Sequence, residues 1–531
     1  MGRKKTQLFL ECLSGTLLAL FGMAAPANAA EAVRTMSLAA LKDKIRGGWA
    51  GQAIGVAYGE PTEFRSLGKI IDWEIKWDPR RVSRAINQDD LYTEMIFCAV
   101  MDAVGLDATP EQFGAAFANY PGSFWHANLG ARRNILRGIA PPLSGDPAHN
   151  AHANDIDFQI ESDFIGLMCP GLPQASNRLA DRVGHVMNYG DGVYGGMFVA
   201  GMYSAAFFES TSTHQVVMAG LACIPRESRY ARIIADTFRW SLEYPDDWRK
   251  VWQRIEDKWA HDDPCPAGAL KPFNIDASIN GAYIAIGLLY GGTDFGKVLE
   301  ISTRCGQDSD CNPSSAGGIV GTMIGYDRIP DGWKRNIEDL GDKKFRFTDY
   351  SFEQIVRSTA ERAKKVIVTE GGRIDKEQAI VPLQLPTQPS LEQWHYGKPV
   401  RRVGISEPDW TFKGDWAPRK GGTRRSNTEG AEAIFEFEGT GVEIVGMYVA
   451  DGGLADVYLD GKFQGTTDCF LDYARNEREV RGEEDVWHAF GLSRGKHVVR
   501  ILVKGRPFRE STDCWVSLAE AVVFDDSSVS D

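Results

Sequence analysis

Two short acidic clusters, far apart in the chain, hold the side chains best suited to chemistry. The first reads NQDD over residues 87–90, and the second reads GQDSDCN over residues 306–312. Hard divalent cations such as Mg²⁺ and Ca²⁺ bind several oxygen ligands at once, and closely spaced carboxylates at a turn or helix end provide them. If the fold brings the two clusters together, they predict a centre for one or two divalent ions.

Each cluster also has a purely structural interpretation. Asp89 and Asp90 open a predicted helix, and Asp308 and Asp310 precede another. Carboxylates in such positions cap free backbone N–H groups and complement the helix dipole. Both helix starts are rich in oxygen ligands and adjoin glycine-rich helices, and this shared character favours a joint metal site over two unrelated caps.

Two further acidic groups are candidates for the same site. Glu63 follows the first glycine-rich helix, close to a predicted helix end, with Glu60 nearby. Residues 155–163 hold four acids without a balancing base, and Asp157 and Glu161 are spaced to share one helical face. A solvated acidic surface is the alternative for both groups.

One stretch suits the binding of a sugar. Residues 123–134 mix aromatic, amide and guanidinium groups, among them Trp125, His126, Asn128 and Arg132. Such a mixture stacks on a sugar ring while its polar groups bind the hydroxyls. Ordinary packing between helices is the alternative.

The elements that must position these residues are mostly helical. From Ser37 onward apolar residues recur at helical spacing, and glycines on that helix allow close backbone packing. The last helix begins at Ser351, where a Ser-x-x-Gln pattern predicts a capping box. Because strand patterns are nearly absent before residue 370, the sequence predicts a large all-α domain over residues 37–369. Other helices are predicted over 90–104, 110–119, 174–188, 193–208, 214–222, 228–243, 246–259, 279–289 and 294–305.

The pattern changes towards the C-terminus. Residues 370–393 combine a Gly-Gly pair with three prolines in a polar stretch and predict a semi-rigid linker. Beyond them, apolar and polar residues alternate at period two between Gly and Asp-Gly turns, as in 433–438 and 442–447. We therefore predict a multidomain chain that ends in an all-β sandwich or jelly roll over residues 394–531.

The N-terminus has the order of a secretory signal. Residues 3–5 are basic, mostly apolar residues follow, and residues 27–29 supply an A-x-A cleavage pattern. We expect a signal peptide over residues 1–30 and a secreted or periplasmic protein that does not associate with a membrane after cleavage. A frayed helix or a membrane anchor is the alternative, although the apolar core is short for a span.

Cysteine usage leaves one question open. Eight cysteines remain after residue 30, and no C-x-x-C pattern occurs among them, which argues against a zinc ribbon or a thioredoxin-like motif. Cys469 and Cys514 are the two in the C-terminal region. An exported protein permits a disulfide between them, and two independently buried thiols are the alternative.

Composition and motif content exclude several function classes. The 531 residues are 43% hydrophobic and 25% charged, which fits a globular chain of two or three domains. A formal net charge of -13 without a basic stripe argues against nucleic-acid binding. No G-x-S-x-G, H-E-x-x-H, Walker or G-x-G-x-x-G motif occurs, so those chemistries are not expected.

Several of these motifs, in this order, resemble the ADP-ribosylglycohydrolase superfamily, over about residues 40–335. They are a Gly-x-x-x-Gly-x-x-x-Gly run leading to Pro-Thr-Glu at 61–63, Gln-Asp-Asp at 88–90, the ranges 157–171, 190–207 and 306–319, and Ile-Pro-Asp-Gly-Trp at 329–333. The resemblance implies a compact bundle of orthogonal helices. It also implies two Mg²⁺ or Mn²⁺ ions between paired aspartates, which bind the vicinal hydroxyls of a ribose.

The resemblance implies roles for single residues. Asp89, Asp90, Asp308 and Asp310 match the family's metal ligands. Glu63 matches a glutamate that reaches toward the metals and is a candidate for acid or base catalysis.

Three positions depart from the family pattern. Gln88 replaces a threonine and still offers a carbonyl oxygen, whereas Cys311 replaces a threonine and is a poor ligand for a hard cation. Gln52 stands where the family has an aspartate. These departures imply that one metal is lost, moved or changed, or that Asn312 supplies the missing oxygen.

The C-terminal region loosely resembles the jelly-roll accessory modules of secreted glycan-degrading enzymes, mainly at residues 452–461 and 492–497. A sugar-binding role and a purely structural role are both open.

Together these observations predict a secreted, metal-dependent glycoside hydrolase that cleaves an anomeric bond of a sugar with a vicinal diol, such as a furanoside, in an extracellular glycan. Two alternatives stay open: release of ADP-ribose from a modified protein or nucleotide, and a catalytically inactive glycan-binding protein. The expected catalytic residues are Glu63, Asp90 and Asp157. The expected substrate contacts are Trp125, His126, Asn128, Arg132, Asp163 and Tyr194. The expected ligands of a divalent cation, with Mg²⁺ as first choice and Mn²⁺ or Ca²⁺ as alternatives, are Gln88, Asp89, Asp90, Asp308, Asp310 and Asn312.

Overall fold

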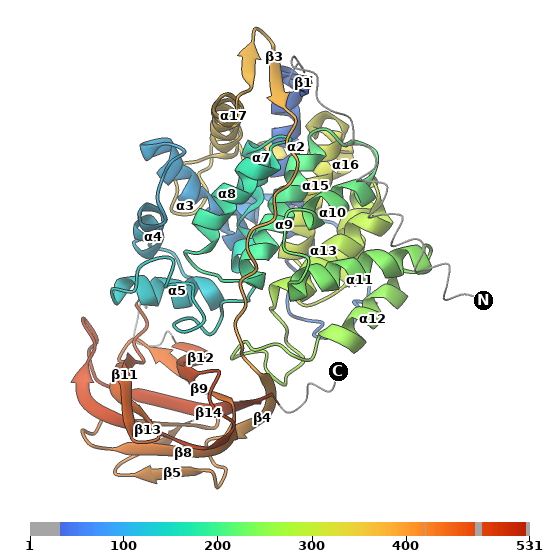
Figure 1. Ribbon diagram of the computed structural model, residues 1–531. Helices are drawn as coiled ribbons and strands as arrows, with labels where there is room; N and C mark the ends of the chain where they lie inside the picture. The colour runs from blue at the N-terminus through green and yellow to red at the C-terminus, as the bar shows by residue number, and fades with distance from the viewer. Residues whose placement is uncertain (1–31, 420, 473–479, 527–531) are drawn as a thin grey trace, which may run out of the picture.

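The computed structural model describes residues 32–419, 421–472 and 480–526. The predicted signal peptide falls on residues 1–31 and lies outside the described residues. Figure 1 shows a helical domain and a β-sandwich in contact, so the predicted fold class, a helical bundle followed by a β-domain, is confirmed.

The helical domain is built around two helices that are buried on all sides. Every residue of α15 (Cys311–Ile324) is buried, and α13 (Ala277–Gly291) is buried except at Tyr290. Helices of this kind belong at the centre of a large core. The other helices are α2 (Leu38–Gly59), α3 (Asp89–Val104), α4 (Pro110–Ala118), α5 (His126–Leu136), α6 (Asp157–Ile160), α7 (Asp163–Met168), α8 (Pro173–Gly184), α9 (Asp191–Ala206), α10 (Thr213–Leu221), α11 (Arg229–Glu243), α12 (Trp248–Trp259), α14 (Phe295–Arg304), α16 (Asp331–Lys334) and α17 (Phe352–Thr369), with short 3₁₀ turns at Pro79–Asn87, Tyr326–Arg328 and Ile337–Asp339.

Helices α2 and α15 contact each other through their backbones. A Cβ atom at Gly51 would lie 2.1 Å from the carbonyl oxygen of Gly317, and one at Gly55 would lie 2.1 Å from that of Pro313. The predicted role of these glycines in close packing is therefore confirmed. The contact brings the segment before α15, at Ser309, against Gly59 at the end of α2.

A small sheet ties the two ends of the helical domain together. Strand β1 (Val33–Ser37) pairs antiparallel with β3 (Gln378–Pro382), which also pairs with β2 (Arg373–Asp375). Strands β2 and β3 lie within the range 370–393, for which the sequence predicted a linker. The predicted capping box at Ser351, which begins α17, is present.

The chain between β3 and the sandwich runs over the surface of the helical domain, from the small sheet to β4 (Figure 1). We call residues 383–397 the connecting segment. Tyr194 of α9 donates a hydrogen bond to the Ser390 carbonyl (3.2 Å) and accepts one from the Glu392 N–H (2.6 Å). Glu392 also contacts His185 Nε2 at 3.0 Å, and Asn177 donates to the Thr387 carbonyl at 3.1 Å. The connecting segment is therefore bound along α8 and α9.

The C-terminal domain consists of two packed antiparallel sheets, in the orders β11-β10-β13-β8-β5 and β12-β9-β14-β7-β6, with β4 paired to β14. Apolar residues of both sheets, such as Phe435, Val457 and Ile444, alternate inward and form one core. Cys469 and Cys514 are both free thiols, so the structure has no disulfide between them. The strands are β4 (Lys398–Gly404), β5 (Trp410–Lys413), β6 (Ala417–Arg419), β7 (Thr423–Ser426), β8 (Glu432–Gly439), β9 (Gly441–Val449), β10 (Gly453–Leu459), β11 (Lys462–Asp468), β12 (Val480–Ala489), β13 (Gly495–Pro507) and β14 (Val516–Asp525).

The two domains meet through buried polar contacts. Arg137, directly after α5, binds Asp468, at the end of β11, through two hydrogen bonds of 2.6 and 2.7 Å. Arg133 donates to the same carboxylate at 3.1 Å and lies over the Tyr448 ring at 3.5 Å. Paired guanidinium and carboxylate groups of this geometry fix the orientation of the surfaces that carry them.

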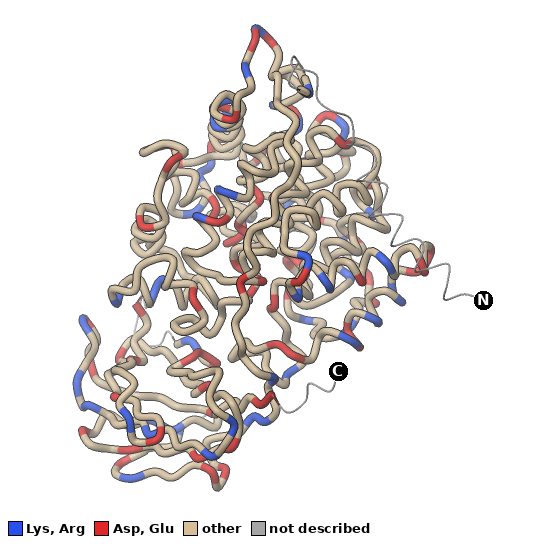
Figure 2. The backbone as a smooth tube through the Cα atoms, viewed as in Figure 1, with Lys and Arg blue, Asp and Glu red and all other residues tan. Residues whose placement is uncertain are grey.

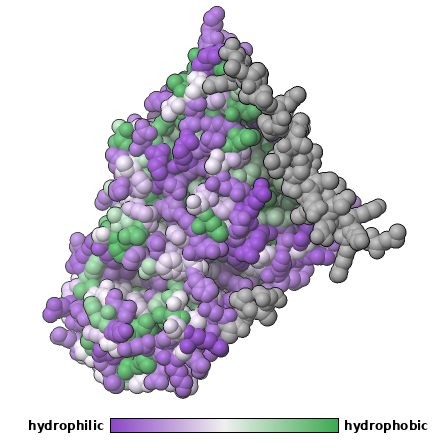
Figure 3. Space-filling view, viewed as in Figure 1, coloured by the Kyte–Doolittle hydropathy of each residue, from purple (hydrophilic) through white to green (hydrophobic). Residues whose placement is uncertain are grey.

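Charged residues of both signs occur in both domains. Figure 2 shows Lys and Arg positions interspersed with Asp and Glu positions along the backbone. On the face shown in Figure 3, hydrophilic residues predominate and hydrophobic ones form small scattered groups. Within the described residues, no helix has the length and apolar character needed to cross a membrane.

Candidate functional site

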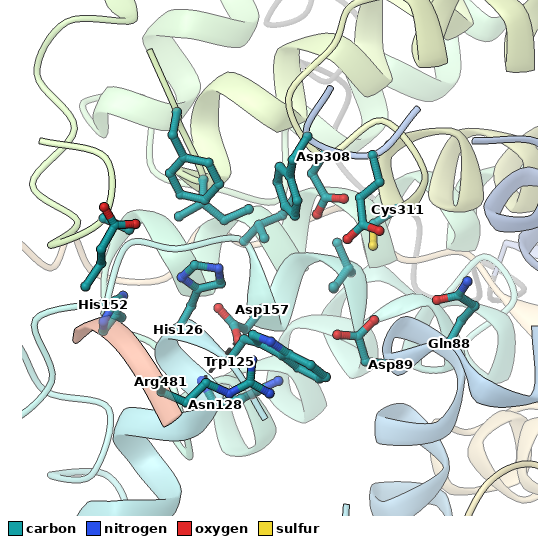
Figure 4. Close-up of a pocket in the computed structure, with 18 of the residues that line it drawn as sticks. Gln88, Asp89, Trp125, His126, Asn128, His152, Asp157, Asp308, Cys311 and Arg481 are labelled. Carbon is teal, nitrogen blue, oxygen red and sulfur yellow. Dashed lines mark hydrogen bonds between the residues drawn. The ribbon is translucent and has the colours of Figure 1, made fainter. Parts of the chain in front are cut away.

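A cavity of about 560 Å³ lies where the helical domain meets β12 of the sandwich. Figure 4 shows two groups of side chains at its ends: Gln88, Asp89, Asp308 and Cys311 at one end, and His126 and His152 at the other, with Asp157 and Trp125 between. We call the first group, together with Glu63, Asp90 and Asp310, the carboxylate end.

The two acidic clusters of the sequence meet at the carboxylate end. Asp89 and Asp90 occupy the first turn of α3, and Asp308 and Asp310 precede α15. The ligand atoms of Asp89, Asp90 and Cys311 lie within 4.8 Å of one another, and so do those of Asp308, Asp310 and Cys311. Cys311 therefore lies between the two carboxylate pairs.

The carboxylate end concentrates negative charge in a buried place. Burial and the neighbouring acids Asp310 and Asp89 raise the pKa of Glu63 to about 8. Burial likewise raises the pKa of Asp308 to about 7 and those of Asp90 and Asp310 well above the ordinary value. None of these four acids takes part in an ion pair among the described residues.

The donor set fits a divalent cation. Asp90 Oδ2, Asp308 Oδ1 and Asp310 Oδ1 are buried and, within the described part of the chain, have no hydrogen-bond partner. Buried polar atoms without a partner are rare in folded proteins, and oxygen atoms that converge in this way are the ligands preferred by Mg²⁺ and Ca²⁺.

Gln88 and Asn312 are the two amide residues expected to add oxygen ligands. Gln88 lines the cavity and makes no side-chain cap to α3. Asn312 donates to Asn280 Oδ1 at 2.8 Å, which leaves its own Oδ1 without a partner among the described residues. Both residues present an oxygen that a cation can use.

Asp157 and Asn128 form the middle of the cavity. The backbone N–H groups of Ala127 and Asn128 donate to Asp157 at 3.2 and 3.1 Å, so Asp157 caps the start of α5. Asn128 Nδ2 donates to Glu161 at 2.5 Å. Burial raises the pKa of Asp157 to about 8. The expectation that Asp157 and Glu161 share a helical face is wrong, because α6 ends at Ile160 and Asn128 connects the two acids instead.

Trp125 and His126 both line the cavity, as expected for substrate contacts. The Trp125 ring lies 4.7 Å from the guanidinium of Arg481, which β12 contributes. His126 has a positive φ of 43°, and burial lowers its pKa to about 3.

Three predicted substrate contacts do not line the cavity. Arg132 donates to the Gly122 carbonyl at 2.8 Å, and Asp163 accepts from Tyr203 at 2.8 Å in the core. Tyr194 binds the connecting segment. These residues position neighbouring segments instead of facing the cavity.

Sequence reasoning missed several residues of the cavity wall. Arg481 and Glu484 come from the sandwich, and nothing in the sequence indicates that β12 reaches a site more than three hundred residues upstream. Phe64, Tyr92 and Phe273 supply aromatic surface. Phe64 follows Glu63 directly, and this adjacency is the signal that could have identified it.

Comparison with solved structures gives distant similarities. A structure described as an ADP-ribosylglycohydrolase-related protein complex is 14% identical, with a TM-score of 0.40, over 61% of this chain and 99% of that one. The CBM36-1 domain of a multidomain xylanase from the hindgut metagenome of Trinervitermes trinervoides is 10% identical, with a TM-score of 0.17, over 23% and 93%. A two-domain esterase active on acetylated mannans is 12% identical, with a TM-score of 0.21, over 38% and 54%.

The family assignment rests on the sequence. No curated protein matches the chain. The profile of the ADP-ribosylglycohydrolase family matches residues 37–367, which include the whole carboxylate end and nearly all of the helical domain. The chain belongs to the ADP-ribosylglycohydrolase family, and at that level it is a hydrolase of glycosyl-type bonds.

Proposed function

We propose that the protein is a secreted, metal-dependent glycoside hydrolase that acts on a sugar with a vicinal diol, such as a furanoside, in an extracellular glycan. One observation carries the proposal: buried carboxylate oxygens without partners converge at one end of a cavity whose walls are partly aromatic. The first feature suits a cation and the second suits a sugar ring.

Asp89, Asp90, Asp308 and Asp310 would hold the cation, with further oxygen atoms from Gln88 or Asn312. Mg²⁺ is the first choice because the donors are mainly hard oxygens, and Mn²⁺ or Ca²⁺ are the alternatives. A bound divalent cation supplies charge stabilisation and chelation of two neighbouring hydroxyls.

Glu63 is the proposed acid and base. Burial and the neighbouring acids raise its pKa to about 8 in the metal-free protein, and a cation at the aspartates would lower it from there. In its protonated form Glu63 can give its proton to the departing oxygen as the anomeric carbon–oxygen bond breaks. Water adds to the anomeric carbon, and the Glu63 carboxylate then accepts the proton that this water loses. Asp157 and Asp90 are further candidates, and of these Asp157 faces the cavity.

A second candidate function is the release of ADP-ribose from a modified protein or nucleotide. Arg346 and Arg481 both line the cavity, and guanidinium groups are suited to bind a diphosphate. The two functions differ in the leaving group and in the need for a phosphate site.

The test is a substrate screen of the purified full chain in Mg²⁺, Mn²⁺ or Ca²⁺. Furanosides and plant or microbial polysaccharides are assayed for new reducing ends, and ADP-ribosylated peptides for free ADP-ribose. We expect reducing ends, and we expect Asp308→Asn to abolish them. Release of ADP-ribose alone would favour the second function. Glycan binding without turnover in any of the three metals would identify a catalytically inactive glycan-binding protein.

A further inference from the structure

We propose that His126, His152, Asp155 and Cys265 bind a zinc ion at the end of the cavity opposite the carboxylate end. We call these four residues the histidine cluster. The proposal goes beyond the hydrolase function and does not depend on it, because none of the four residues belongs to the carboxylate end.

The ligand atoms of the histidine cluster already stand at distances suited to one ion. One atom from each residue lies within 4.8 Å of the other three. His126 Nδ1 is 3.6 Å from Asp155 Oδ2, and Cys265 Sγ is 3.5 Å from His152 Nδ1. Zinc bonds of about 2.0 to 2.3 Å in a tetrahedron place neighbouring ligand atoms roughly 3.3 to 3.8 Å apart. These two distances fall in that range, and the pair His152 Nδ1 and Asp155 Oδ2, at 2.7 Å, needs to open slightly.

Three of the ligand groups crowd together in the histidine cluster. Asp155 Oδ2 and Cys265 Sγ lie 2.7 and 3.5 Å from the same ring nitrogen, His152 Nδ1. In the metal-free protein the imidazole N–H and the Cys265 thiol can both donate to the Asp155 carboxylate. A Cys-His-Asp catalytic triad would use the two different ring nitrogens instead. Loss of the imidazole and thiol protons would leave lone pairs that face one another, which is the donor set that a metal ion takes.

The histidine cluster is buried and lies beside further acids. His152 and Asp155 are 4% and 1% exposed. The acids Asp276 and Glu484 lie close enough to raise the pKa of Asp155 further than burial does alone. An ion of positive charge held by Asp155 would offset this repulsion.

Ligand chemistry selects zinc. Two imidazoles, a thiolate and a carboxylate are the donors of tetrahedral zinc sites, whereas Mg²⁺ and Ca²⁺ prefer oxygen alone. Four protein ligands leave no open position, so the expected role is structural. The His126 side chain is 21% exposed and faces the cavity, which gives the ion a way in.

The ion would join segments that form the cavity wall. His126 begins α5, His152 and Asp155 lie in the loop before α6, and Cys265 lies in the loop between α12 and α13. The loop before α6 and the loop between α12 and α13 are already joined by a hydrogen bond from the Ile156 N–H to the Ile275 carbonyl, at 3.0 Å. Glu484 of β12 lies 3.9 Å from His152 Nε2, the place of an outer-shell carboxylate that orients a ligating histidine.

The test uses Co²⁺ as a spectroscopic probe of the metal-free full chain, with excess Mg²⁺ present. We expect one equivalent of Co²⁺ to bind with a thiolate-to-cobalt charge-transfer band, and we expect Zn²⁺ to displace it. Cys265→Ser should abolish the band and weaken Co²⁺ binding at least tenfold, on the order of what lost zinc-site contacts cost. Cys311→Ser is the matched control, since Cys311 is the cysteine at the carboxylate end, and it should keep the band.

The outcomes are distinguishable from those of the substrate screen. Absence of a thiolate band in the wild-type chain overturns the zinc proposal, and so does a band that survives Cys265→Ser but not Cys311→Ser. If Cys265→Ser does not fold, as judged by its melting curve, His152→Gln replaces it. Unchanged Co²⁺ affinity in His152→Gln would then overturn the proposal, and a loss of at least about tenfold would support it.

Discussion

Glu63 is the residue on which the proposed chemistry depends most directly. It lies in the turn after α2, in the wall of the cavity, with Asp89 and Asp310 close enough to raise its pKa.

Glu63→Gln should lower kcat by about 10² or more, because general acid or base catalysis contributes a factor of that size. The measurement is the steady-state rate on whichever substrate the screen identifies. Glu74→Gln is the control, since Glu74 is exposed, pairs with Lys76 at 3.6 Å and does not line the cavity, and it should keep wild-type activity. Equal rates for wild type and Glu63→Gln would remove Glu63 from the mechanism.

The acids of the carboxylate end also predict how stability changes with pH. Folding raises the pKa of Glu63 from 4.5 to about 8 and that of Asp308 from 3.8 to about 7. Groups with raised values stabilise the folded state fully below the ordinary pKa, and this contribution is lost as the pH rises through the folded value. The metal-free protein should therefore melt at lower temperature as the pH rises from about 5 to about 8.

Added Mg²⁺ should reverse this loss, and most strongly at the upper end of the range, where the ligands are ionised. At a hundredfold excess over the dissociation constant the stabilisation is about 2.7 kcal/mol. Thermal melts at both ends of the range, with and without Mg²⁺, measure it. Asp308→Asn should show a smaller pH slope and a smaller Mg²⁺ effect; if Mg²⁺ acts equally at both pH values, the cation binds elsewhere.

At the scale of elements, the contact between α2 and α15 decides whether the two acidic clusters meet. Glycines one turn apart on α2 let the backbone of α15 approach, and this places Asp308 and Asp310 beside the end of α2. A displacement of either helix would separate carboxylates that must converge.

Gly55→Ala should destabilise the fold by about 1 to 3 kcal/mol and weaken Mg²⁺ binding as well, because its Cβ would overlap the Pro313 carbonyl. Chemical denaturation and a Mg²⁺ titration test the two effects. Gly332→Ala in α16 is the control, since a Cβ there meets nothing within 4 Å. Loss of stability without any loss of Mg²⁺ affinity would show that α15 does not position the ligands.

The sequence predicted these elements well and their long-range contacts poorly. Helical periodicity and the capping box at Ser351 are local, and the structure confirms both. The pairing of β1 with β3 joins residues at opposite ends of the helical domain, so no local pattern indicates it. The end of α6 at Ile160 could not be predicted for a related reason. The acids Asp157 and Glu161 follow helical spacing, but their side chains are positioned by hydrogen bonds from Asn128 of another helix.

The histidine cluster shows the same limit at the site. In the sequence, Asp155 is one of four neighbouring acids and Cys265 is one of eight cysteines after residue 30. They come together because the loop before α6 pairs with the loop that leads into α13. The spacing of residues in the sequence does not indicate that these two loops contact each other.

For the whole molecule, the domain interface completes the cavity. Arg481 and Glu484 of β12 form part of its wall, and the buried contacts of Asp468 with Arg133 and Arg137 hold the sandwich in place. A sandwich that moved away would remove one side of the substrate site.

Asp468→Asn should weaken domain docking by about 1 to 3 kcal/mol, because it replaces the charged acceptor shared by Arg133 and Arg137 with a neutral one, while Asp472 still pairs with both guanidinium groups. Calorimetry should show the sandwich and the helical domain melting as separate transitions, and limited proteolysis should cut between them. Asp349→Asn, which removes an exposed pair with Lys344, should leave the melting curve unchanged. A single unaltered transition in Asp468→Asn would show that other contacts govern docking.

The connecting segment sets the order in which the molecule can be assembled. Since β1 and β3 lie side by side, the helical domain closes on itself before the chain leaves it. The segment then binds α8 and α9, which exist only once that domain has folded. Synthesis runs from the N-terminus and domains fold as units. The sandwich therefore folds after the helical domain, when the connecting segment can already bind α8 and α9. The cavity is thus completed by β12, far downstream of the helices that form most of its wall, so a nascent chain that stops short of β12 has an incomplete cavity.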